Sequence, residues 1–258
     1  MATMGLKGKK VVITGGSRGI GLGIAEGFAG AGCDLTLIAL DDEVEEVAQQ
    51  LADKYGCPAC GFLCDITDRS SLDAVTQQID RVDVLVNNAG LELITPIEDD
   101  DPEIEETFRR IVDINVMGTY YVTRRCLPKI PDGGRIIMTA SQWAKSAVGE
   151  FSAYSASKHA NLGFMRSLAK ELGPRGISVN AVCPGWVRTI ASMRSLAAMA
   201  RRADQAESEL LDEIVGAQAF PGLMEPHEMA DTYLFLASDA ARNITGQAIT
   251  VDRGDLLI

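Results

Sequence analysis

A tyrosine and a lysine four residues apart, Tyr154 and Lys158, are the pair in this sequence best suited to chemistry. On a helix this spacing puts both side chains on one face, where they can reach one bound molecule. An ammonium about 4 Å from a phenolate attracts it by about 4 kcal/mol at an effective dielectric near 20. That attraction lowers the pKa of the phenol by roughly three units, before desolvation offsets part of the shift. Tyr154 is therefore predicted to act as a general acid or base near neutral pH.

Ser141 lies upstream of this pair, at the end of an apolar run. Its hydroxyl could hold the oxygen of a substrate carbonyl by a hydrogen bond while Tyr154 transfers the proton. The YxxxK spacing also occurs by chance in many helices, so the rest of the chain must decide between chemistry and packing.

A glycine-rich loop, TGGSRGIG at residues 14–21, follows the first apolar run and opens a helical pattern. Gly15, Gly19 and Gly21 permit a tight turn and a close approach of the backbone to a diphosphate, and a helix N-terminus attracts its negative charge. Glycines also occur in simple turns, but the position between strand and helix favours a dinucleotide site.

Short apolar runs alternate with amphipathic segments of helix length, and seven of these runs are strand candidates. Each run is nearly continuous in apolar residues, as in parallel strands that are covered on both faces. The pattern predicts an α/β fold over residues 1–258: one Rossmann-type domain with a doubly wound sheet of about seven parallel strands flanked by helices. The candidate strands are residues 10–14, 35–40, a run around Phe62, 82–86, 135–139, 177–182 and 247–251.

The segment 188–222 has no strand pattern and carries several arginines among small apolar residues. An insertion of this length between the sixth and seventh strands is predicted to form a helical lid over a substrate site. Ordinary amphipathic helices would give the same pattern.

The chain is acidic, with a formal net charge of -12 and a pI near 4.7. This charge disfavours nucleic acid as a partner, because phosphate contacts need a basic face. The acidic segments 41–46 and 98–106 are predicted to be solvated helix starts. No apolar run is long enough for a membrane span and no secretory signal is evident, so we expect a cytoplasmic protein. The cysteines lack the spacing of a zinc site, so we expect reduced thiols and no metal.

Five motifs, taken together in order and spacing, resemble those of the classical short-chain dehydrogenases/reductases, over about residues 8–254. They are TGGSRGIG, NNAG at residues 87–90, Asn115, Ser141 with the YxxxK pair, and PGWVRT at residues 184–189. The resemblance implies an NAD(P)-dependent oxidoreductase that interconverts a secondary alcohol and its ketone, with a small molecule as substrate.

The resemblance also implies residue roles. Tyr154 would be the acid/base, Ser141 would orient the carbonyl, and Lys158 would lower the pKa of Tyr154 and hold the nicotinamide ribose. Asn115 would support a water that relays protons to Lys158, although a hydrogen-bonded core residue is the alternative. Asp65 would bind the adenine amino group or, alternatively, cap the following helix. The implied cofactor contacts are Gly15, Ser17, Arg18, Gly19, Ile20, Gly21, Asp65, Ile66, Asn87, Ala89, Gly90, Tyr154, Lys158, Pro184, Gly185, Val187 and Thr189.

The choice between NAD and NADP depends on the end of the second strand. Relatives that use NAD carry an acidic residue there, and this chain has Ala39. Arg18, inside the glycine loop, is placed to hold a 2′-phosphate, which favours NADP. Asp41 and Asp42 follow closely and favour NAD if the backbone brings one to the ribose.

Candidate substrate contacts are the residues next to the catalytic groups: Glu92, Gln142, Trp143, Trp186 and Met193. Glu92 could bind a polyol or repel an anion, whereas Arg188 or Arg194 could hold a carboxylate. The sequence leaves sugars, hydroxy acids, aryl ketones and acyl thioesters open.

Two other functions remain as alternatives. A 3-oxoacyl thioester reductase would be expected to show a basic patch for a carrier protein, and a non-catalytic nucleotide sensor would be expected to lose part of the catalytic set. The family resemblance further implies a homo-oligomer, a dimer or tetramer, formed through the segments 108–121 and 154–172.

Overall fold

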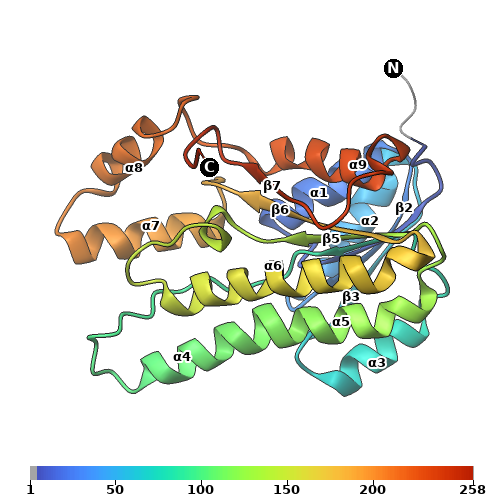
Figure 1. The fold of residues 1–258 in the computed structure, drawn as a ribbon, viewed down its shortest axis with the longest axis horizontal. Helices are drawn as coiled ribbons and strands as arrows, with labels where there is room; N and C mark the ends of the chain where they lie inside the picture. The colour runs from blue at the N-terminus through green and yellow to red at the C-terminus, as the bar shows by residue number, and fades with distance from the viewer. Residues whose placement is uncertain (1–4, 258) are drawn as a thin grey trace.

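Parallel strands and covering helices form three layers in the computed structural model, which describes residues 5–257 (Figure 1). The strands lie in the order β3-β2-β1-β4-β5-β6-β7, and every neighbouring pair is parallel. The order reverses between β1 and β4, the point where doubly wound sheets bind their ligands. The strands are β1 (Lys10–Thr14), β2 (Asp34–Ala39), β3 (Ala59–Leu63), β4 (Val84–Asn87), β5 (Arg135–Thr139), β6 (Ser178–Pro184) and β7 (Ala248–Val251).

Two hydrophobic clusters, one on each face of the sheet, explain the nearly continuous apolar runs. In β1, Val11 and Ile13 belong to one cluster and Val12 to the other. In β4, Leu85 likewise faces the opposite side from its neighbours Val84 and Val86. Side chains alternate across a strand, so a strand covered on both faces must be apolar at successive positions.

Helices α1, α2 and α9 cover one face of the sheet, and α3, α5 and α6 cover the other (Figure 1). The α-helices are α1 (Gly19–Gly30), α2 (Val44–Tyr55), α3 (Arg69–Gln77), α4 (Glu103–Val112), α5 (Thr119–Cys126), α6 (Ser152–Leu172), α7 (Ile190–Ala203), α8 (Glu207–Gly216) and α9 (Ala230–Ala237). The π-helical turn η1 (Asp113–Gly118) joins α4 to α5, and the 3₁₀ turns are η2 (Leu127–Lys129), η3 (Gln142–Ala144), η4 (Gly173–Arg175), η5 (Pro226–Met229) and η6 (Asp239–Ala241). The predicted single-domain fold is confirmed.

Helices α7 and α8 pack on each other and project beyond one end of the sheet, at the left of Figure 1. A capping box between Thr189 and Ser192 begins α7, and α8 buries none of its residues. Because α8 has few buried contacts, it is the part of this pair best placed to move. Its function as a lid stays a prediction.

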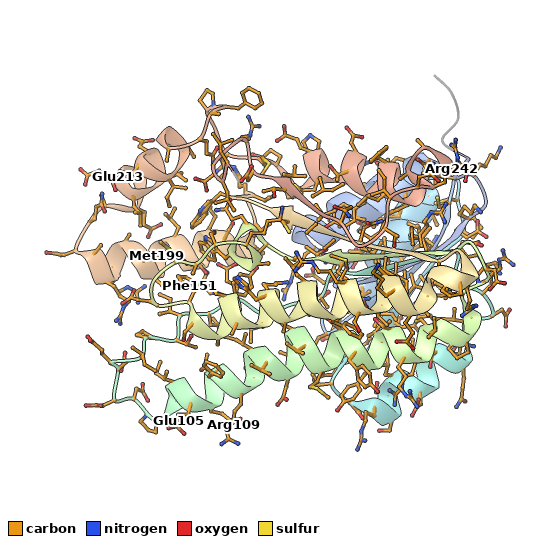
Figure 2. The ribbon with its side chains drawn as sticks, in the orientation of Figure 1. Glu105, Arg109, Phe151, Met199, Glu213 and Arg242 are labelled. Atoms are coloured by element: carbon orange, nitrogen blue, oxygen red, sulfur yellow. The ribbon has the colours of Figure 1, made fainter. Side chains whose placement is uncertain are left out.

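Most of the acidic segments form solvated helix starts, as predicted. Glu45 and Glu46 lie in the first turn of α2, and α4 also begins with acidic residues. Figure 2 shows Glu105 and Arg109 of α4 pointing away from the body of the molecule. Asp41 is different and enters the cavity described below. Within residues 5–257, no helix is long and apolar enough to cross a membrane, and the six cysteines are free thiols.

Candidate active site

One cavity of about 460 Å³, in the usual range for ligand sites, lies beyond the carboxyl ends of the strands. It joins the glycine loop to Tyr154 and Lys158. Most of the predicted site residues line it: Gly15, Ser17, Arg18, Gly19, Ile20, Gly21, Asp65, Ile66, Ala89, Gly90, Glu92, Ser141, Gln142, Trp143, Tyr154, Lys158, Pro184, Gly185, Trp186, Val187 and Thr189. Asn87, Asn115 and Met193 are not among the lining residues.

The glycine loop needs its glycines for conformation and for space. Gly15 and Gly19 have φ of 63° and 55°, in the left-handed region that side chains disfavour. A Cβ on Gly21 would overlap the carbonyl oxygen of Gly15. The first turn of α1 has no side-chain cap and no acidic residue, so its N–H groups and positive dipole face the cavity mouth. This cradle fits the diphosphate of a dinucleotide.

The second asparagine of NNAG, Asn88, ties the glycine loop to the strands. Its Nδ2 donates to Thr14 O at 3.0 Å and Gly15 O at 3.1 Å, and its Oδ1 accepts from Thr139 Oγ1 at 3.1 Å. The prediction that Asn87 lines the cavity is wrong, because its Nδ2 points to Thr123 Oγ1 at 3.0 Å. Successive strand residues face opposite sides, so only one of two adjacent asparagines can reach the cavity.

At the far end of the glycine loop, Ser17 Oγ donates to Asp41 Oδ2 at 2.5 Å. The other oxygen, Asp41 Oδ1, is buried and has no hydrogen-bond partner within the described chain. A buried acceptor without a partner is rare in folded proteins and fits a ligand hydroxyl. Arg18 lines the same end of the cavity and is exposed. An acid and a cation therefore both border the place where the adenosine ribose would lie.

Asp65 lies at the cavity wall after β3, and its Oδ1 accepts from Thr67 N at 2.8 Å and Thr67 Oγ1 at 2.7 Å. The alternative that it caps the next helix is wrong. Asp68 is the N-cap of α3, and its side chain accepts from Ser70 N at 2.9 Å. Asp65 is thus fixed in a local turn with its carboxylate at the cavity.

Tyr154 and Lys158 share one face near the start of α6, and Ser141 reaches them from the loop after β5. Lys158 Nζ lies 5.5 Å from the centroid of the Tyr154 ring and donates to Thr139 O at 2.8 Å. Ser141 Oγ accepts from Trp143 N at 3.1 Å and borders the same cavity as the Tyr154 phenol. A carbonyl oxygen between Ser141 and Tyr154 would meet two O–H groups.

The prediction of a lowered pKa for Tyr154 is wrong for the protein alone. Burial raises the pKa of this phenol above its ordinary value, the nearby Glu92 raises it further, and the neighbouring Ser141 hydroxyl lowers it. Lys158 is itself desolvated, which lowers the pKa of its ammonium to about 8. Burial is the largest cause of both shifts, because a buried site disfavours the charged form of each group. Tyr154 is therefore a protonated donor at neutral pH.

Asn115 is fully buried in the π-helical turn between α4 and α5. Its Oδ1 accepts from Leu91 N at 2.7 Å, and its Nδ2 donates to Leu91 O at 2.9 Å and to Ser157 Oγ at 2.9 Å. These three bonds clamp the loop after NNAG onto α6. The side chain is occupied as a hydrogen-bonded core residue, the alternative considered from the sequence. A π-turn within a helix is often found at functional sites.

Gly90 fits between Asn115 and Lys158. A Cβ at this position would lie 3.2 Å from Asn115 Oδ1 and 3.4 Å from Lys158 Nζ. The contact with Asn115 is tighter than side chains normally accept, so glycine lets the loop approach Asn115 closely.

Aromatic rings border the substrate end of the cavity. The Trp143 ring meets those of Tyr154 at 6.0 Å and Trp186 at 6.1 Å, both edge to face, and Phe151 at 5.1 Å. The two edge-to-face contacts have a favoured geometry of aromatic pairs and help to hold Trp143 in place.

Gln142, next to Ser141 in the sequence, is held by the C-terminal segment. Its Nε2 donates to Asp255 Oδ2 at 2.7 Å. Asp252 fixes that segment in turn, since its carboxylate accepts from the backbone N–H groups of Gly254 and Leu256 at 3.0 and 2.8 Å. The prediction of Gln142 at the cavity did not include this partner, which is far away in the sequence.

Comparison with known proteins agrees with this geometry. Residues 15–255 match the family model described as enoyl-(acyl carrier protein) reductase. The oxidoreductase UcpA of Salmonella typhimurium is 37% identical over 261 residues, which cover 98% of this chain and 96% of the relative. The chain belongs to the short-chain dehydrogenase/reductase family. As a member, it is an NAD(P)-dependent oxidoreductase that interconverts alcohols and ketones.

Two solved structures of this family share the whole fold. L-sorbose reductase from Gluconobacter frateurii, complexed with NADPH and L-sorbose, matches with a TM-score of 0.89 and 30% identity and covers 99% of both chains. A putative NAD(P)-dependent gluconate 5-dehydrogenase from Beutenbergia cavernae, with bound NADP at low occupancy, has a TM-score of 0.88 and 35% identity. That match covers 98% of this chain and 99% of the other.

Proposed function

We propose that this short-chain dehydrogenase/reductase reduces a ketone to a secondary alcohol, and catalyses the reverse reaction, with Tyr154 as the group that transfers the proton. The supporting observation is that Ser141, Tyr154 and Lys158 border the same cavity as the glycine loop. When bound, the nicotinamide would supply or accept the hydride. The protein then has to place the carbonyl and handle one proton.

Each catalytic side chain has a separate task in this proposal. Ser141 and Tyr154 donate hydrogen bonds to the carbonyl oxygen, and Tyr154 passes its proton to that oxygen as the carbon is reduced. Lys158, held by Thr139 O, stabilises the phenolate that is left, because a cation beside a desolvated anion lowers its energy. Asn115 keeps the neighbouring loop in place, which makes it a positioning residue.

For the cofactor, the finer proposal is a preference for NADP(H). Arg18 at the cavity and the NADP(H) in both related structures support it. Asp41 opposes it, since a carboxylate with a buried, unpartnered oxygen suits a ribose hydroxyl and repels a 2′-phosphate. The ratio of kcat/KM for NADPH and NADH tests this preference, and an unchanged ratio in Arg18→Ala would remove Arg18 from the explanation.

A 3-oxoacyl thioester reductase remains the second candidate, because the matching family model carries an acyl carrier protein description. The expected basic patch is weak here. Arg188 pairs with Glu225 at 2.8 Å, and Arg202 pairs with Glu150 at 2.6 Å. Paired arginines offer little net charge to an acidic carrier protein. The geometry therefore favours a small free ketone.

The test of the function uses purified protein, both cofactors, and a panel of ketones, alcohols and acyl thioesters, with nicotinamide absorbance as the readout. Tyr154→Phe should lower kcat/KM at least 100-fold, the range typical of a lost general acid, and leave the dinucleotide Kd within about threefold. Tyr55→Phe, at a partly exposed phenol outside the cavity, is the matched control. Substantial turnover in Tyr154→Phe would exclude it as the proton donor.

We also propose a homo-oligomer formed through the outer faces of α4, α5 and α6. Phe108 and Tyr120 are 39% exposed there, and the Tyr120 ring meets Phe164 edge to face at 6.1 Å. Exposed aromatic side chains on adjacent helices are typical of subunit interfaces. Light scattering should give a mass above one chain, reduced in Phe108→Glu. The cytoplasmic location stays a prediction.

A further inference from the structure

Glu92 carries a carboxylate at the cavity, and the proposed proton transfer does not involve it. It follows NNAG closely and borders the same cavity as Tyr154 and Lys158. Its charge raises the pKa of the Tyr154 phenol, which makes Tyr154 a weaker acid. Because Glu92 makes proton donation by Tyr154 harder, another function must explain its position at the cavity. Substrate recognition is the role that the surroundings of Glu92 support.

Two residues of helix α7, Arg194 and Ser195, lie next to Glu92. Arg194 Nη2 donates to Glu92 O at 2.7 Å, and the hydroxyl of the buried Ser195 lies close enough to the Glu92 carboxylate to lower its pKa. The backbone of Glu92 is therefore held by Arg194, and Ser195 is placed to orient its side chain. A carboxylate can accept about four hydrogen bonds, so an interaction with Ser195 leaves acceptor capacity for a ligand.

The charges around Glu92 restrict what that ligand can be. Burial raises the pKa of Glu92 above its ordinary value, and Ser195, Arg194 and Lys158 offset part of that rise and so favour the charged carboxylate. With two cations already beside it, the carboxylate has little to gain from a substrate ammonium. A substrate carboxylate close to the reacting carbon would meet the negative charge of Glu92 in a poorly solvated space, where repulsion is strong. Neutral hydroxyl groups satisfy the remaining acceptor sites without adding charge.

The aromatic wall points to the same class of ligand. Trp143 and Trp186 border the cavity that Glu92 also borders. A ligand that fills this space must present C–H surface to the indoles and O–H groups to the acid. Sites of this kind combine apolar walls with a few fixed polar anchors.

We propose that Glu92 is a specificity residue that selects a polyhydroxylated, uncharged ketone or its polyol, by accepting hydrogen bonds from hydroxyl groups near the reacting carbon. The proposal rests on the oxidoreductase function proposed above. It names the substrate class of that site and assigns α7 the task of fixing the anchor through Arg194 and Ser195.

The test compares three substrates with the preferred cofactor: a ketohexose, an unsubstituted ketone of equal chain length, and a 3-oxo acid of equal chain length. The readout is kcat/KM for each. The native protein should prefer the ketohexose to both others by at least tenfold. Glu92→Gln, which keeps the size and removes the charge, should lower the ratio of ketohexose to plain ketone at least tenfold, mainly through KM. Glu92→Asp should retain part of that ratio.

Glu98→Gln removes an exposed acid outside the cavity and is the control for loss of one charge. A melting curve for each variant establishes that it is folded. Ser195→Ala should also lower the ratio of ketohexose to plain ketone, and it serves as a second test if Glu92→Gln is unstable. An unchanged ratio in both variants, or a native preference for the 3-oxo acid, would overturn the proposal. If the native protein reduces no ketone, the proposed oxidoreductase function is wrong. If it reduces plain ketones as well as the ketohexose, only the proposal that Glu92 selects hydroxylated substrates is wrong.

Discussion

The two ends of the cavity are built from different kinds of groups. At the glycine loop, backbone carbonyls and N–H groups, together with the half-buried Asn88, define most of the surface. At the substrate end, side chains converge from the loop after β4, the turn η3, helix α7 and the C-terminal segment. Backbone surfaces accept a common ligand such as a dinucleotide, whereas side chains change with little effect on the fold. The difference explains how one family can share a cofactor and differ in substrate.

We expect the largest effect from one methyl group added at the cofactor end of the cavity. In Gly21→Ala, the Cβ would overlap the Gly15 carbonyl oxygen, so the loop must shift. We expect the dinucleotide Kd to rise at least 100-fold in calorimetry. Gly163→Ala is the matched control, because Gly163 is exposed on α6 and has nothing within 4 Å of an added Cβ. Alanine there should stabilise the helix by about 0.5–1 kcal/mol. Normal binding in Gly21→Ala would mean that the loop can relax.

The next largest effect should come from the clamp that joins the two ends. Asn115→Ala leaves the N–H and C=O of Leu91 without their partners, and unpaired buried groups cost about 1–3 kcal/mol each. We expect a total loss of about 2–4 kcal/mol in the free energy of unfolding by denaturant. Asn243→Ala, at an exposed asparagine, should change it by less than about 0.5 kcal/mol. Equal stability of the two variants would show that Asn115 is not a clamp.

A smaller effect is expected from the acid beside the ribose. Asp41→Asn removes the negative charge and keeps a hydrogen-bonding group near Ser17. We expect the ratio of kcat/KM for NADPH to that for NADH to rise about tenfold, because one like-charge contact is worth about 1 kcal/mol or more near a protein surface. Asp42→Asn, at the exposed neighbour, should leave the ratio within about twofold. If both variants behave alike, the Ser17–Asp41 pair does not select the cofactor.

The smallest effect should appear in the pH dependence of dinucleotide binding. The pKa of Lys158 lies at about 8, so the ammonium is present below that pH and is lost above it. If Lys158 holds the ribose, affinity should fall severalfold between pH 7 and pH 9. Glu92 raises the pKa of Lys158, so Glu92→Gln should move the fall to lower pH. A Kd that does not change over this range would show that the charge of Lys158 does not contribute to binding.

Local patterns predicted the parts of the molecule that depend on local geometry. The strands could be predicted because each carries apolar residues for two faces, and Tyr154 and Lys158 because a helix repeats every three to four residues. The glycine loop could be predicted because its conformation requires glycine at Gly15 and Gly19.

Contacts between distant segments could not be predicted in the same way. The register of β4 decides whether Asn87 or Asn88 faces the cavity. Asn115 is placed by a π-turn, which the local sequence pattern did not indicate. The pKa of Tyr154 depends on how much surrounding protein excludes water, and pairwise charge spacing does not contain that information. Met193 lies on α7, but the direction of its side chain is decided by how that helix packs.

The bond between Gln142 and Asp255 connects the C-terminal segment to a residue that lines the cavity. Trimming of the C-terminal residues, a fused tag or docking of another subunit would therefore disturb Gln142, the neighbour of Ser141. Laboratory forms of this enzyme that differ only in their last few residues should therefore be compared for turnover before they are treated as equivalent.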